Sequence, residues 1–450
     1  MGLVKLLSAV LSVRRAEKLD AQQLMELQGL RFRKLLKYAY EHSKFYRAFY
    51  LDYGIKSADI EEIGLEDLPI IDKSIMMENY DDLVTDEALK REQIESFIET
   101  AADSRAWYKG RYKVVHTSGS SGAIGLFVYG ADEWEISKAL GLRATGFNHP
   151  VYRRKRIVFI AATDGLFASV SSFYNLQSFL VKLLPISISS PIEKIREQIN
   201  RFKPDVITGY ASGLNLLAQE QLAGNIDIAP SEAFCTGDPL TASYRKLIVD
   251  AFGVNPVNMY GSSETMTMAA ECSEQHQMHL YHDWVATQVV TDDGTVSRTG
   301  KLVVTNLYNF TQPLIRYQMN DVIEMEDSPC ACGSSMPLIK SIAGRTEEFL
   351  WFERSSGGRD FIHPIVLAEF FVPGLEKLQF SQTSSNALLM KAVLGGDQEQ
   401  VVKAIHRRMS EILSEKGLQD DVRFEVQVVG AIDNDAKTGK FQLIKPLVRA

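Results

Sequence analysis

The sequence predicts an α/β protein with a large N-terminal domain and a smaller α+β C-terminal domain. From about residue 112, short apolar runs bounded by turn residues alternate with helical stretches, a pattern typical of an α/β sheet. Hairpin-like runs follow between 285 and 325, and a separate module covers residues 346–450. A chain of 450 residues is long enough for several domains whose cores fold unaided.

The first hundred residues are predicted to be mainly helical. Residues 15–50 and 57–100 show helical periodicity. The inward-facing aromatic side chains are expected to be Phe45, Tyr46, Phe49 and Tyr50.

The N-terminal stretch 1–13 is amphipathic and far too short to cross a bilayer. Its apolar residues at helical spacing are Leu3, Leu6, Leu7, Val10 and Val13. We expect this helix to dock on the protein's own core. Arg14 and Arg15 leave open the alternative of a helix that lies on a membrane surface.

The α/β region and the hairpins are expected in the large domain, 1–345. Its predicted strands are Val114–Val115, Arg156–Ala162, Asp205–Gly209 and Val257–Tyr260. The runs Val285–Val290, Lys301–Leu307 and Val322–Met325 are separated by turn residues, which favours antiparallel hairpins in a smaller β subdomain. The C-terminal domain, 346–450, is predicted from strands at Leu378–Thr383, Leu388–Val393 and Val422–Val429 and a helix over 397–416.

Charge and cysteine content narrow the class of function. The 49 Lys and Arg residues against 57 Asp and Glu give a net charge of −8, which argues against nucleic acid as a partner. Four cysteines are too few for a disulfide framework, and no secretory signal pattern opens the chain, so a cytoplasmic location is expected.

A hydroxyl- and glycine-rich loop follows the strand at Val114–Val115. In the segment Thr117-Ser118-Gly119-Ser120-Ser121-Gly122, glycines let backbone N–H groups approach an anion and hydroxyl groups add donors, so the loop can bind phosphates. Alone, such a loop is more often a flexible connection. It lacks the Gly-Lys-Ser/Thr ending of the P-loop NTPases, and the chain contains no Gly-x-Gly-x-x-Gly fingerprint.

Five further segments follow this loop in order. They are Thr236-Gly237-Asp238-Pro239-Leu240-Thr241, Asn258-Met259-Tyr260-Gly261-Ser262-Ser263-Glu264, Pro313-Leu314-Ile315-Arg316-Tyr317-Gln318-Met319-Asn320-Asp321, Gly344-Arg345-Thr346-Glu347-Glu348 and Lys437-Thr438-Gly439-Lys440. This series resembles the adenylate-forming superfamily of acyl-CoA synthetases, peptide-synthetase adenylation domains and luciferases. Within it, the nearest match is the phenylacetate-CoA ligase branch with its capsule-biosynthesis relatives, which the opening segment 35–46 also resembles. The resemblance covers essentially the whole chain and implies a large N-terminal domain with a small, mobile C-terminal lid.

The resemblance implies a role in ATP binding for each of these segments. Thr117, Ser118, Gly119, Ser120, Ser121 and Gly122 would bind the β- and γ-phosphates. Gly237, Asp238 and Pro239 would line the adenine pocket, and Tyr260 would lie against the base, followed by Gly261, Ser262 and Ser263 in the same binding segment. Glu264 would hold Mg²⁺, Asp321 would accept the ribose hydroxyls, and Arg345 would lie beside ribose and phosphate.

The resemblance also implies a catalytic lysine in the C-terminal domain. Lys440 would bridge the attacking carboxylate and the α-phosphate, two anions that need a cation between them. Lys437 and Lys445 are nearby competitors for this role. Glu347 aligns with the hinge aspartate about which the C-terminal domain would rotate.

Two departures from the family pattern stand out. The usual Pro-Lys-Gly ending of the phosphate loop is Ala123-Ile124-Gly125, which removes a basic residue near phosphate. The usual Thr-Gly before the ribose aspartate is Met319-Asn320, although Asp321 stays in register.

A Cys/His set gathers three of the four cysteines. Cys272 and a histidine with Cys330 and Cys332 can supply a tetrahedral structural zinc site. The histidines in reach are His276, His279 and His282, and the resemblance favours His279. The alternative is unbound, buried cysteines with surface histidines. Cys235 is expected to be a packed small residue and not a nucleophile.

These expectations combine into an ATP-dependent ligase. It would convert a carboxylic acid to an acyl-adenylate and transfer the acyl group to coenzyme A. The acid is expected to be aryl or apolar, from Gly165, Leu166, Phe167 and Tyr210 near the family's acyl pocket. Two alternatives remain, namely transfer to an amine, sugar or deazaflavin cofactor, and a non-catalytic nucleotide-binding scaffold. A homodimer is left open.

Overall fold

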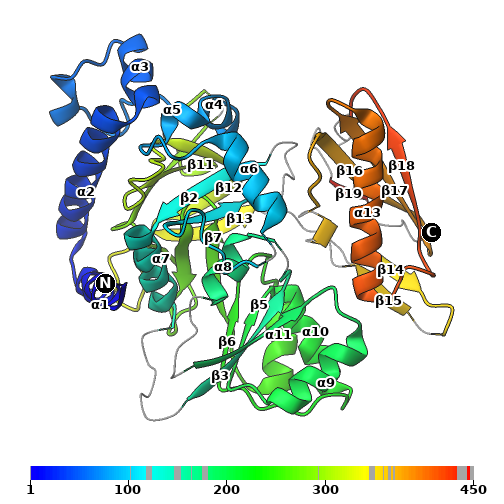
Figure 1. Ribbon diagram of the computed structural model, residues 1–450. Coiled ribbons are helices and arrows are strands. Elements are labelled where there is room, and N and C mark those ends of the chain that lie inside the picture. Colours follow the sequence, from blue (N-terminus) through cyan, green and yellow to red (C-terminus); the bar gives the residue numbers. More distant parts are fainter. Residues whose placement is uncertain are drawn as a thin grey trace.

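The computed structural model describes most of the chain. The described residues are 2–101, 103–117, 124–145, 154–163, 165–174, 181–291, 293–343, 350–357, 359–362, 366–367, 370–432 and 443–445. Helices and strands alternate along most of this range, so the α/β class is confirmed. The N-terminal part is built on one large sheet, and the orange C-terminal part lies to one side of it (Figure 1).

The large sheet has eleven strands in the order β10-β11-β12-β13-β9-β8-β7-β6-β5-β3-β4. Its parallel half consists of β3 (Lys155–Ala161), β4 (Val181–Ser187), β5 (Val206–Gly209), β6 (Glu232–Cys235) and β7 (Val257–Ser262). The connecting helices are α8 (Ala168–Tyr174), α9 (Ile192–Phe202), α10 (Ala211–Leu222) and α11 (Ala242–Phe252). The central strands read as continuous apolar runs because helices bury them, as in other parallel sheets.

The antiparallel half continues the same sheet from β7. Its strands are β8 (Met266–Glu271), β9 (Met278–Leu280), β10 (Val285–Val290), β11 (Thr299–Asn306), β12 (Tyr317–Glu326) and β13 (Leu338–Ala343). The predicted hairpins are confirmed, since β11 pairs antiparallel with both β10 and β12. These hairpins do not form the β subdomain of their own that the sequence predicted. Strand β13 pairs with β9 and β8 pairs with β7, so the hairpins continue the same sheet as the parallel half.

A second, short ribbon carries the predicted phosphate loop. Strands β1 (Tyr112–His116) and β2 (Leu126–Gly130) pair antiparallel, and His116 lies opposite Leu126. The loop between them is therefore the end of a β-hairpin. All five residues of β1 are buried, so the ribbon is fixed in the core.

Helices of the first 145 residues surround the antiparallel half. They are α1 (Gly2–Ala16), α2 (Ala21–His42), α3 (Lys44–Asp52), α4 (Lys73–Glu78), α5 (Tyr80–Leu83), α6 (Arg91–Thr100) and α7 (Ala131–Arg143). Asp20 begins α2 with a capping box, in which its carboxylate accepts from the Gln23 N–H. Within the described residues, none of the helices combines the length and the apolarity that a membrane span requires.

The aromatic residues of α3 are largely buried as predicted. Phe45, Tyr46 and Tyr50 lie in the core, and Phe49 packs against it. The Tyr46 hydroxyl donates to the Pro313 carbonyl at 3.0 Å, and the Ile315 N–H donates to that hydroxyl at 3.1 Å. Tyr46 thereby fixes the chain just before β12.

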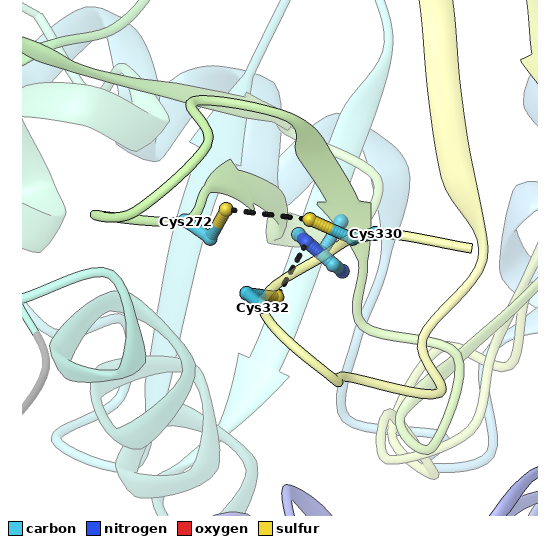
Figure 2. A group of neighbouring side chains, drawn as sticks. Cys272, Cys330 and Cys332 are labelled. Carbon is cyan, nitrogen blue, oxygen red and sulfur yellow. Dashed lines mark hydrogen bonds between the residues drawn. The ribbon is translucent and has the colours of Figure 1, made fainter. Parts of the chain in front are cut away.

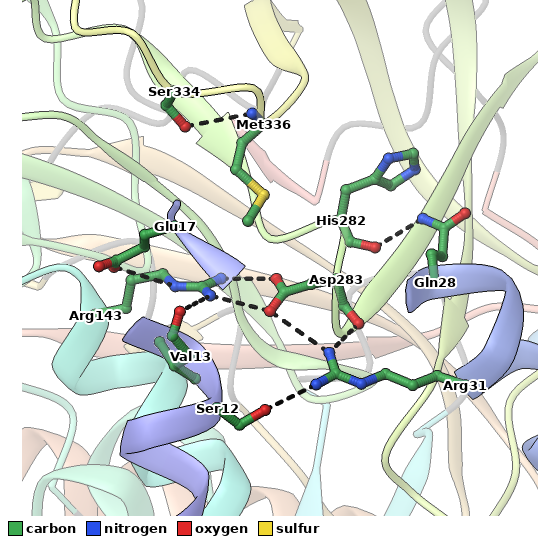
Figure 3. Close-up of polar contacts among 10 residues, drawn as sticks. All are labelled: Ser12, Val13, Glu17, Gln28, Arg31, Arg143, His282, Asp283, Ser334 and Met336. Carbon is green, nitrogen blue, oxygen red and sulfur yellow. Dashed lines mark hydrogen bonds and ion pairs between the residues drawn. The ribbon is translucent and has the colours of Figure 1, made fainter. Parts of the chain in front are cut away.

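A buried carboxylate ties α1, α2 and α7 to the sheet (Figure 3). Asp283 is fully buried and accepts two hydrogen bonds from Arg143 of α7, at 2.8 and 3.0 Å. Arg31 of α2 lies 3.5 Å from the same carboxylate and also donates to the Asp283 carbonyl. The Arg143 guanidinium donates to the Val13 carbonyl of α1 at 3.0 Å, so one carboxylate organises three helices.

The C-terminal part has its own sheets. Strands β14 (Leu350–Glu353) and β15 (Arg359–Ile362) form a ribbon. A four-stranded sheet has the order β18-β17-β16-β19, with β16 (Leu375–Ser384), β17 (Ala387–Leu394), β18 (Arg423–Val428) and β19 (Ile444–Lys445). Helix α13 (Gln398–Lys416) covers this sheet. The predicted boundary at 345/346 lies outside the described residues.

Lys416, the last residue of α13, connects this part to the parallel half. Its ammonium is buried, lies 3.2 Å from the Asp360 carboxylate, and donates to the Ser190 carbonyl at 2.8 Å. Arg354 donates to the other Asp360 oxygen at 2.6 Å. A buried lysine that satisfies groups of both parts fixes their contact in this conformation.

Replacing Asp283 tests how much the buried carboxylate stabilises the N-terminal helices. Asp283→Ala leaves the buried Arg143 without its main partner, so we expect a loss of about 3–5 kcal/mol in the free energy of unfolding. Chemical denaturation measures this loss.

The matched control is Asp132→Ala. Asp132 also joins α7 to α1, through an ion pair with Lys5 at 2.9 Å, but this pair is exposed on the surface. We expect the control to change stability by less than about 1 kcal/mol. Equal losses in both variants would contradict the importance of burial.

Candidate active site

The candidate site begins where the parallel strands end. In open α/β sheets, ligands bind beyond the carboxyl ends of the strands, where the topology changes direction. Here the change occurs at β7, which pairs parallel with β6 and antiparallel with β8. One predicted nucleotide segment, residues 237–239, directly follows β6, and another, residues 260–264, covers the end of β7 and the turn after it. Both segments therefore lie at this edge of the sheet.

The predicted adenine segment, Gly237 to Pro239, directly follows β6. Gly237 has φ +83, and a Cβ there would lie 2.6 Å from the Tyr210 ring, so the position requires glycine. The Asp238 carboxylate accepts from the N–H groups of Ala211 and Ser212, which start α10. Asp238 therefore caps a helix, a structural role that the sequence did not indicate.

The turn between β7 and β8 holds the next predicted segment, residues 260–264. A Cβ on Gly261 would lie 2.5 Å from the Met266 carbonyl, so only glycine fits. Buried side chains satisfy the carbonyls of the turn: Tyr129 donates to Ser263 at 2.7 Å and Asn306 to Glu264 at 2.9 Å. These hydrogen bonds fix the backbone of the turn.

Three of the predicted side chains lie together beside this turn. The Tyr260 hydroxyl donates to Asp321 of β12 at 2.8 Å. Burial raises the pKa of the Glu264 carboxyl, and the negative charge of Asp321 raises it further. Burial and the adjacent Asp321 carboxylate also raise the pKa of Tyr260. Tyr260 thus contacts the predicted ribose carboxylate, whose charge also acts on the predicted magnesium carboxylate, and the Tyr260 phenol remains neutral.

The base of the phosphate loop adjoins the same turn. Thr117 Oγ1 accepts from the Gly125 N–H at 2.8 Å and closes the loop at its base. The Ser263 hydroxyl donates to the His116 carbonyl at 3.2 Å, which joins this base to the β7–β8 turn. Ser262 instead faces Thr265, with 3.2 Å between the two hydroxyl oxygens.

Several predicted residues lie outside the described part of the chain. These are Ser118, Gly119, Ser120, Ser121 and Gly122 of the loop, together with Arg345, Glu347 and Lys440. Lys445, one of the competitors for the catalytic role, is described and lies in β19, where it pairs with Ser381 in the C-terminal sheet.

Lys73 is a charged neighbour that the sequence reasoning missed. Its positive charge lowers the pKa of the Glu264 carboxyl, against the larger effect of burial. Ile71 places it there, because Ile71 exchanges backbone hydrogen bonds with Arg316 at 3.1 Å and Gln318 at 2.8 Å beside β12. The residues 69–73 contain an apolar run and a helix cap, but nothing in them indicates which strand they join.

His116 is a second residue that the sequence reasoning passed over. Burial lowers the pKa of its imidazole to about 4, so the ring is neutral at pH 7. Its ring centroid lies 4.4 Å from that of Phe167. The residues expected near the acyl pocket, Leu166, Phe167 and Tyr210, are buried in the core clusters.

The four predicted zinc ligands form one compact group away from this edge. The ligand atoms of Cys272, His279, Cys330 and Cys332 all lie within 4.8 Å of one another. Figure 2 shows Cys272 facing Cys330, with 3.7 Å between the sulfur atoms, and Cys332 beside them. Cys332 Sγ lies 3.5 Å from His279 Nε2. These separations fit ligands on a single tetrahedral ion, for which bonds of about 2.3 Å to sulfur and about 2.0 Å to nitrogen give spacings of about 3.8 and 3.5 Å.

The other histidines of this region have different surroundings. His276 Nε2 lies 2.7 Å from the Asn255 amide nitrogen, and its other ring nitrogen faces Glu271. Burial lowers the pKa of His282 to about 4. The choice of His279 among the three is therefore consistent with the cluster. Cys235 is buried, and burial raises the pKa of its thiol, which agrees with a packed small residue.

Comparison with known proteins gives distant homologues. No family model matches the chain. Protein CapK of Staphylococcus aureus is 23% identical over 388 residues, which cover 84% of this chain and 80% of that protein. The phenylacetate-coenzyme A ligase of Thermus thermophilus is 26% identical over 351 residues, covering 74% of this chain and 73% of the relative. The Escherichia coli ligase of the same name is 26% identical over 347 residues, 74% of each chain.

Solved structures share the fold over nearly the whole chain. A 2-hydroxyisobutyryl-CoA ligase in complex with 2-HIB-AMP and CoA, in its thioesterification state, has a TM-score of 0.60 at 19% identity and covers 96% of this chain and 91% of its own. An open conformation of that ligase gives 0.59 at 18% identity, covering 96% of this chain and 93% of its own. Over most of its length the chain is thus a distant homologue of the phenylacetate-coenzyme A ligases and CapK, and it shares the fold of adenylate-forming CoA ligases.

Proposed function

We propose that this protein joins a carboxylic acid to coenzyme A in two steps. In the first, a carboxylate oxygen attacks the α-phosphorus of ATP, the bond to the β-phosphate oxygen breaks, and pyrophosphate leaves. In the second, the thiol of coenzyme A attacks the acyl carbon of the acyl-adenylate; AMP leaves, and the thiol proton passes to solvent. Neither step forms a covalent bond to the protein.

The convergence at the β7–β8 turn supports this proposal most directly. Thr117, Glu264 and Asp321 lie far apart in the sequence, yet Ser263 joins the loop base to the turn, and Tyr260 joins the turn to β12. Along this edge, the Thr117 hydroxyl would serve the phosphates, Glu264 the metal ion and Asp321 the ribose hydroxyls. This order matches the successive parts of a nucleotide. The names of the relatives, which include phenylacetate-coenzyme A ligase, indicate the joining of an acid to coenzyme A. The geometry of the edge is consistent with that reaction.

Glu264 is assigned to Mg²⁺ because of its environment. A carboxylate is a hard oxygen ligand of the kind that Mg²⁺ prefers. Its burial and the adjacent Asp321 charge disfavour ionisation, and a divalent cation reverses this effect. Lys73, whose positive charge lowers the pKa of Glu264, would add positive charge for the phosphates, where the loop ending Ala123-Ile124-Gly125 lacks the usual lysine.

The remaining groups of the proposed mechanism come from the end of the large domain and from the C-terminal domain. Lys440 would lie between the two reacting anions, and Arg345 would contact ribose and phosphate. Glu347 would act as the hinge that exchanges the adenylation face for the thiol-transfer face. These three roles follow from the resemblance alone.

The metal of the Cys/His group is proposed to be a structural zinc ion. Cys272, His279, Cys330 and Cys332 would occupy all four tetrahedral positions and leave none for a substrate. The Gln275 N–H donates to Cys272 Sγ at 3.4 Å, which suits a sulfur that carries negative charge. The ion would hold the β8–β9 turn, β9 and the 330–333 segment together.

The proposal extends to the class of the acid and to the acceptor. An aryl or otherwise apolar acid is proposed from Phe167 and Tyr210 beside the site. A second candidate is transfer to an acceptor other than coenzyme A. A further relative favours it: the fumarate–(S)-2,3-diaminopropanoate ligase of Enterobacter agglomerans, 26% identical over 148 residues, names an amine as the partner of the acid.

Pyrophosphate release tests the first step and the role of Glu264. With ATP, Mg²⁺ and a panel of aryl and aliphatic acids, we expect release that requires one class of acid. Glu264→Gln keeps the shape of the side chain but removes the charge, so the rate should fall at least about hundredfold. Thermal stability should not fall, because burial already disfavours the ionised form.

Glu62→Gln, the same change at an exposed site, should leave the rate unchanged. Release from ATP without any acid would contradict the proposed reaction.

Separate assay of the two steps tests Lys440. Lys440→Ala should slow adenylate formation by at least about 10²-fold, because the charge between the two anions is lost. Thioester formation from preformed adenylate should change far less. Lys437→Ala is the matched control three positions away and should retain both steps. Equal loss of both steps in Lys440→Ala would exclude a separate adenylation face.

Elemental analysis tests the zinc site independently of activity. We expect one zinc ion per chain in the purified protein and none in Cys330→Ser. A strong chelator should lower the thermal unfolding temperature of the native protein, because a bound structural metal stabilises the folded state. Cys235→Ala removes a cysteine outside the cluster and should retain the metal. Full metal content in Cys330→Ser would show that this cluster is not the site.

A further inference from the structure

Helix α1 carries apolar side chains on two opposite faces. The face against the core uses small or medium residues, namely Ala9, Val13 and Ala16, which are 6%, 0% and 2% exposed. The larger residues Val4, Leu7 and Leu11 are 72%, 54% and 54% exposed. Their spacing of three and four positions places them in one stripe along the helix. The docked helix therefore exposes its bulky stripe.

Polar contacts hold α1 in this orientation. Arg143 donates to the Val13 carbonyl at 3.0 Å, and Arg31 donates to Ser12 Oγ at 3.0 Å (Figure 3). Lys5 pairs with Asp132 of α7 at 2.9 Å. Rotation of α1 to bury the stripe would break all of these contacts. The exposed stripe is thus a fixed feature of the surface, and helix α1 lies at the edge of the molecule in Figure 1.

Basic residues continue the same stripe. Arg14 and Arg15 are exposed in the last turn of α1, and Lys18 follows the helix. Two acidic groups lie nearby. Glu17 lies 3.6 Å from Arg143, and the charges of Arg14 and Lys18 also act on its carboxyl, whereas Asp132 pairs with Lys5. In a chain of net charge −8, this surface combines three bulky apolar residues with three cationic ones.

We propose that α1 binds the surface of an anionic lipid bilayer, with Val4, Leu7 and Leu11 in the interfacial layer and the basic residues among the head groups. A bilayer supplies both an apolar layer and negative charge, and this combination matches the stripe. A second copy of α1 fits less well, because it offers apolar side chains but no acidic residues opposite Arg14 and Arg15. The inference does not depend on the ligase activity.

Vesicle co-sedimentation of the full-length protein tests the proposal. Binding is expected to vesicles that contain phosphatidylglycerol and not to vesicles of phosphatidylcholine alone, and it should weaken as salt rises. Leu7→Glu/Leu11→Glu should lower the bound fraction at least about tenfold, because two anchoring side chains become negative. Arg14→Gln/Arg15→Gln should also weaken binding to anionic vesicles, because it removes the charge attraction to the head groups. The apolar side chains of the stripe are unchanged in this variant.

A matched control separates the stripe from general surface hydrophobicity. Met25 and Leu30 of α2 are 68% and 70% exposed but five positions apart, so they form no common stripe. Met25→Glu/Leu30→Glu introduces the same charges and should retain binding. Circular dichroism and light scattering check that each variant is folded and report its oligomeric state. Absence of vesicle binding by the native protein overturns the proposal, as does a dimer that Leu7→Glu/Leu11→Glu dissociates without any lipid effect.

Discussion

The tight turn between β7 and β8 is the constraint on which the arrangement of this protein depends. At this turn a parallel sheet becomes an antiparallel one, so the carboxyl ends of the parallel strands face groups carried by β12. Gly261 is required because the Met266 carbonyl leaves no room for a Cβ. Hydrogen bonds from Tyr129 and Asn306 hold the turn from behind. Loss of this geometry would separate Glu264 from Asp321.

Burial gives the charged groups around the turn their chemical character. Burial and the charge of Asp321 raise the pKa of Glu264, while Lys73 opposes that shift. A divalent cation bound at Glu264 would favour the ionised form of this carboxyl. The same burial keeps His116 neutral, so its imidazole contributes hydrogen bonding and packing but no charge. This electrostatic environment is consistent with the proposal that a cation and an anionic ligand bind here.

The periphery is held by other buried polar groups. Asp283 links three helices to the sheet, and Lys416 links the C-terminal part to the parallel half. The Cys/His cluster joins the end of β8, strand β9 and the 330–333 segment. Strand β9 has only three residues, so few backbone hydrogen bonds connect it to its neighbours. Each of these groups is costly to bury alone and stable only with its partners, so each fixes one arrangement of neighbouring elements.

The sequence by itself determined the α/β class, most of the strands and the identity of the Cys and His residues that lie in one cluster, and the order of its segments predicted a nucleotide-binding edge. These features depend on local periodicity, on turn residues and on spacing along the chain, which are all visible in one dimension. Only the tertiary structure decided that the hairpins of 285–325 belong to the main sheet, that Asp238 caps α10, and that the charge of Lys73 acts on the Glu264 carboxyl. Those results depend on which edges pair and which ends meet, through contacts between segments that local patterns do not encode.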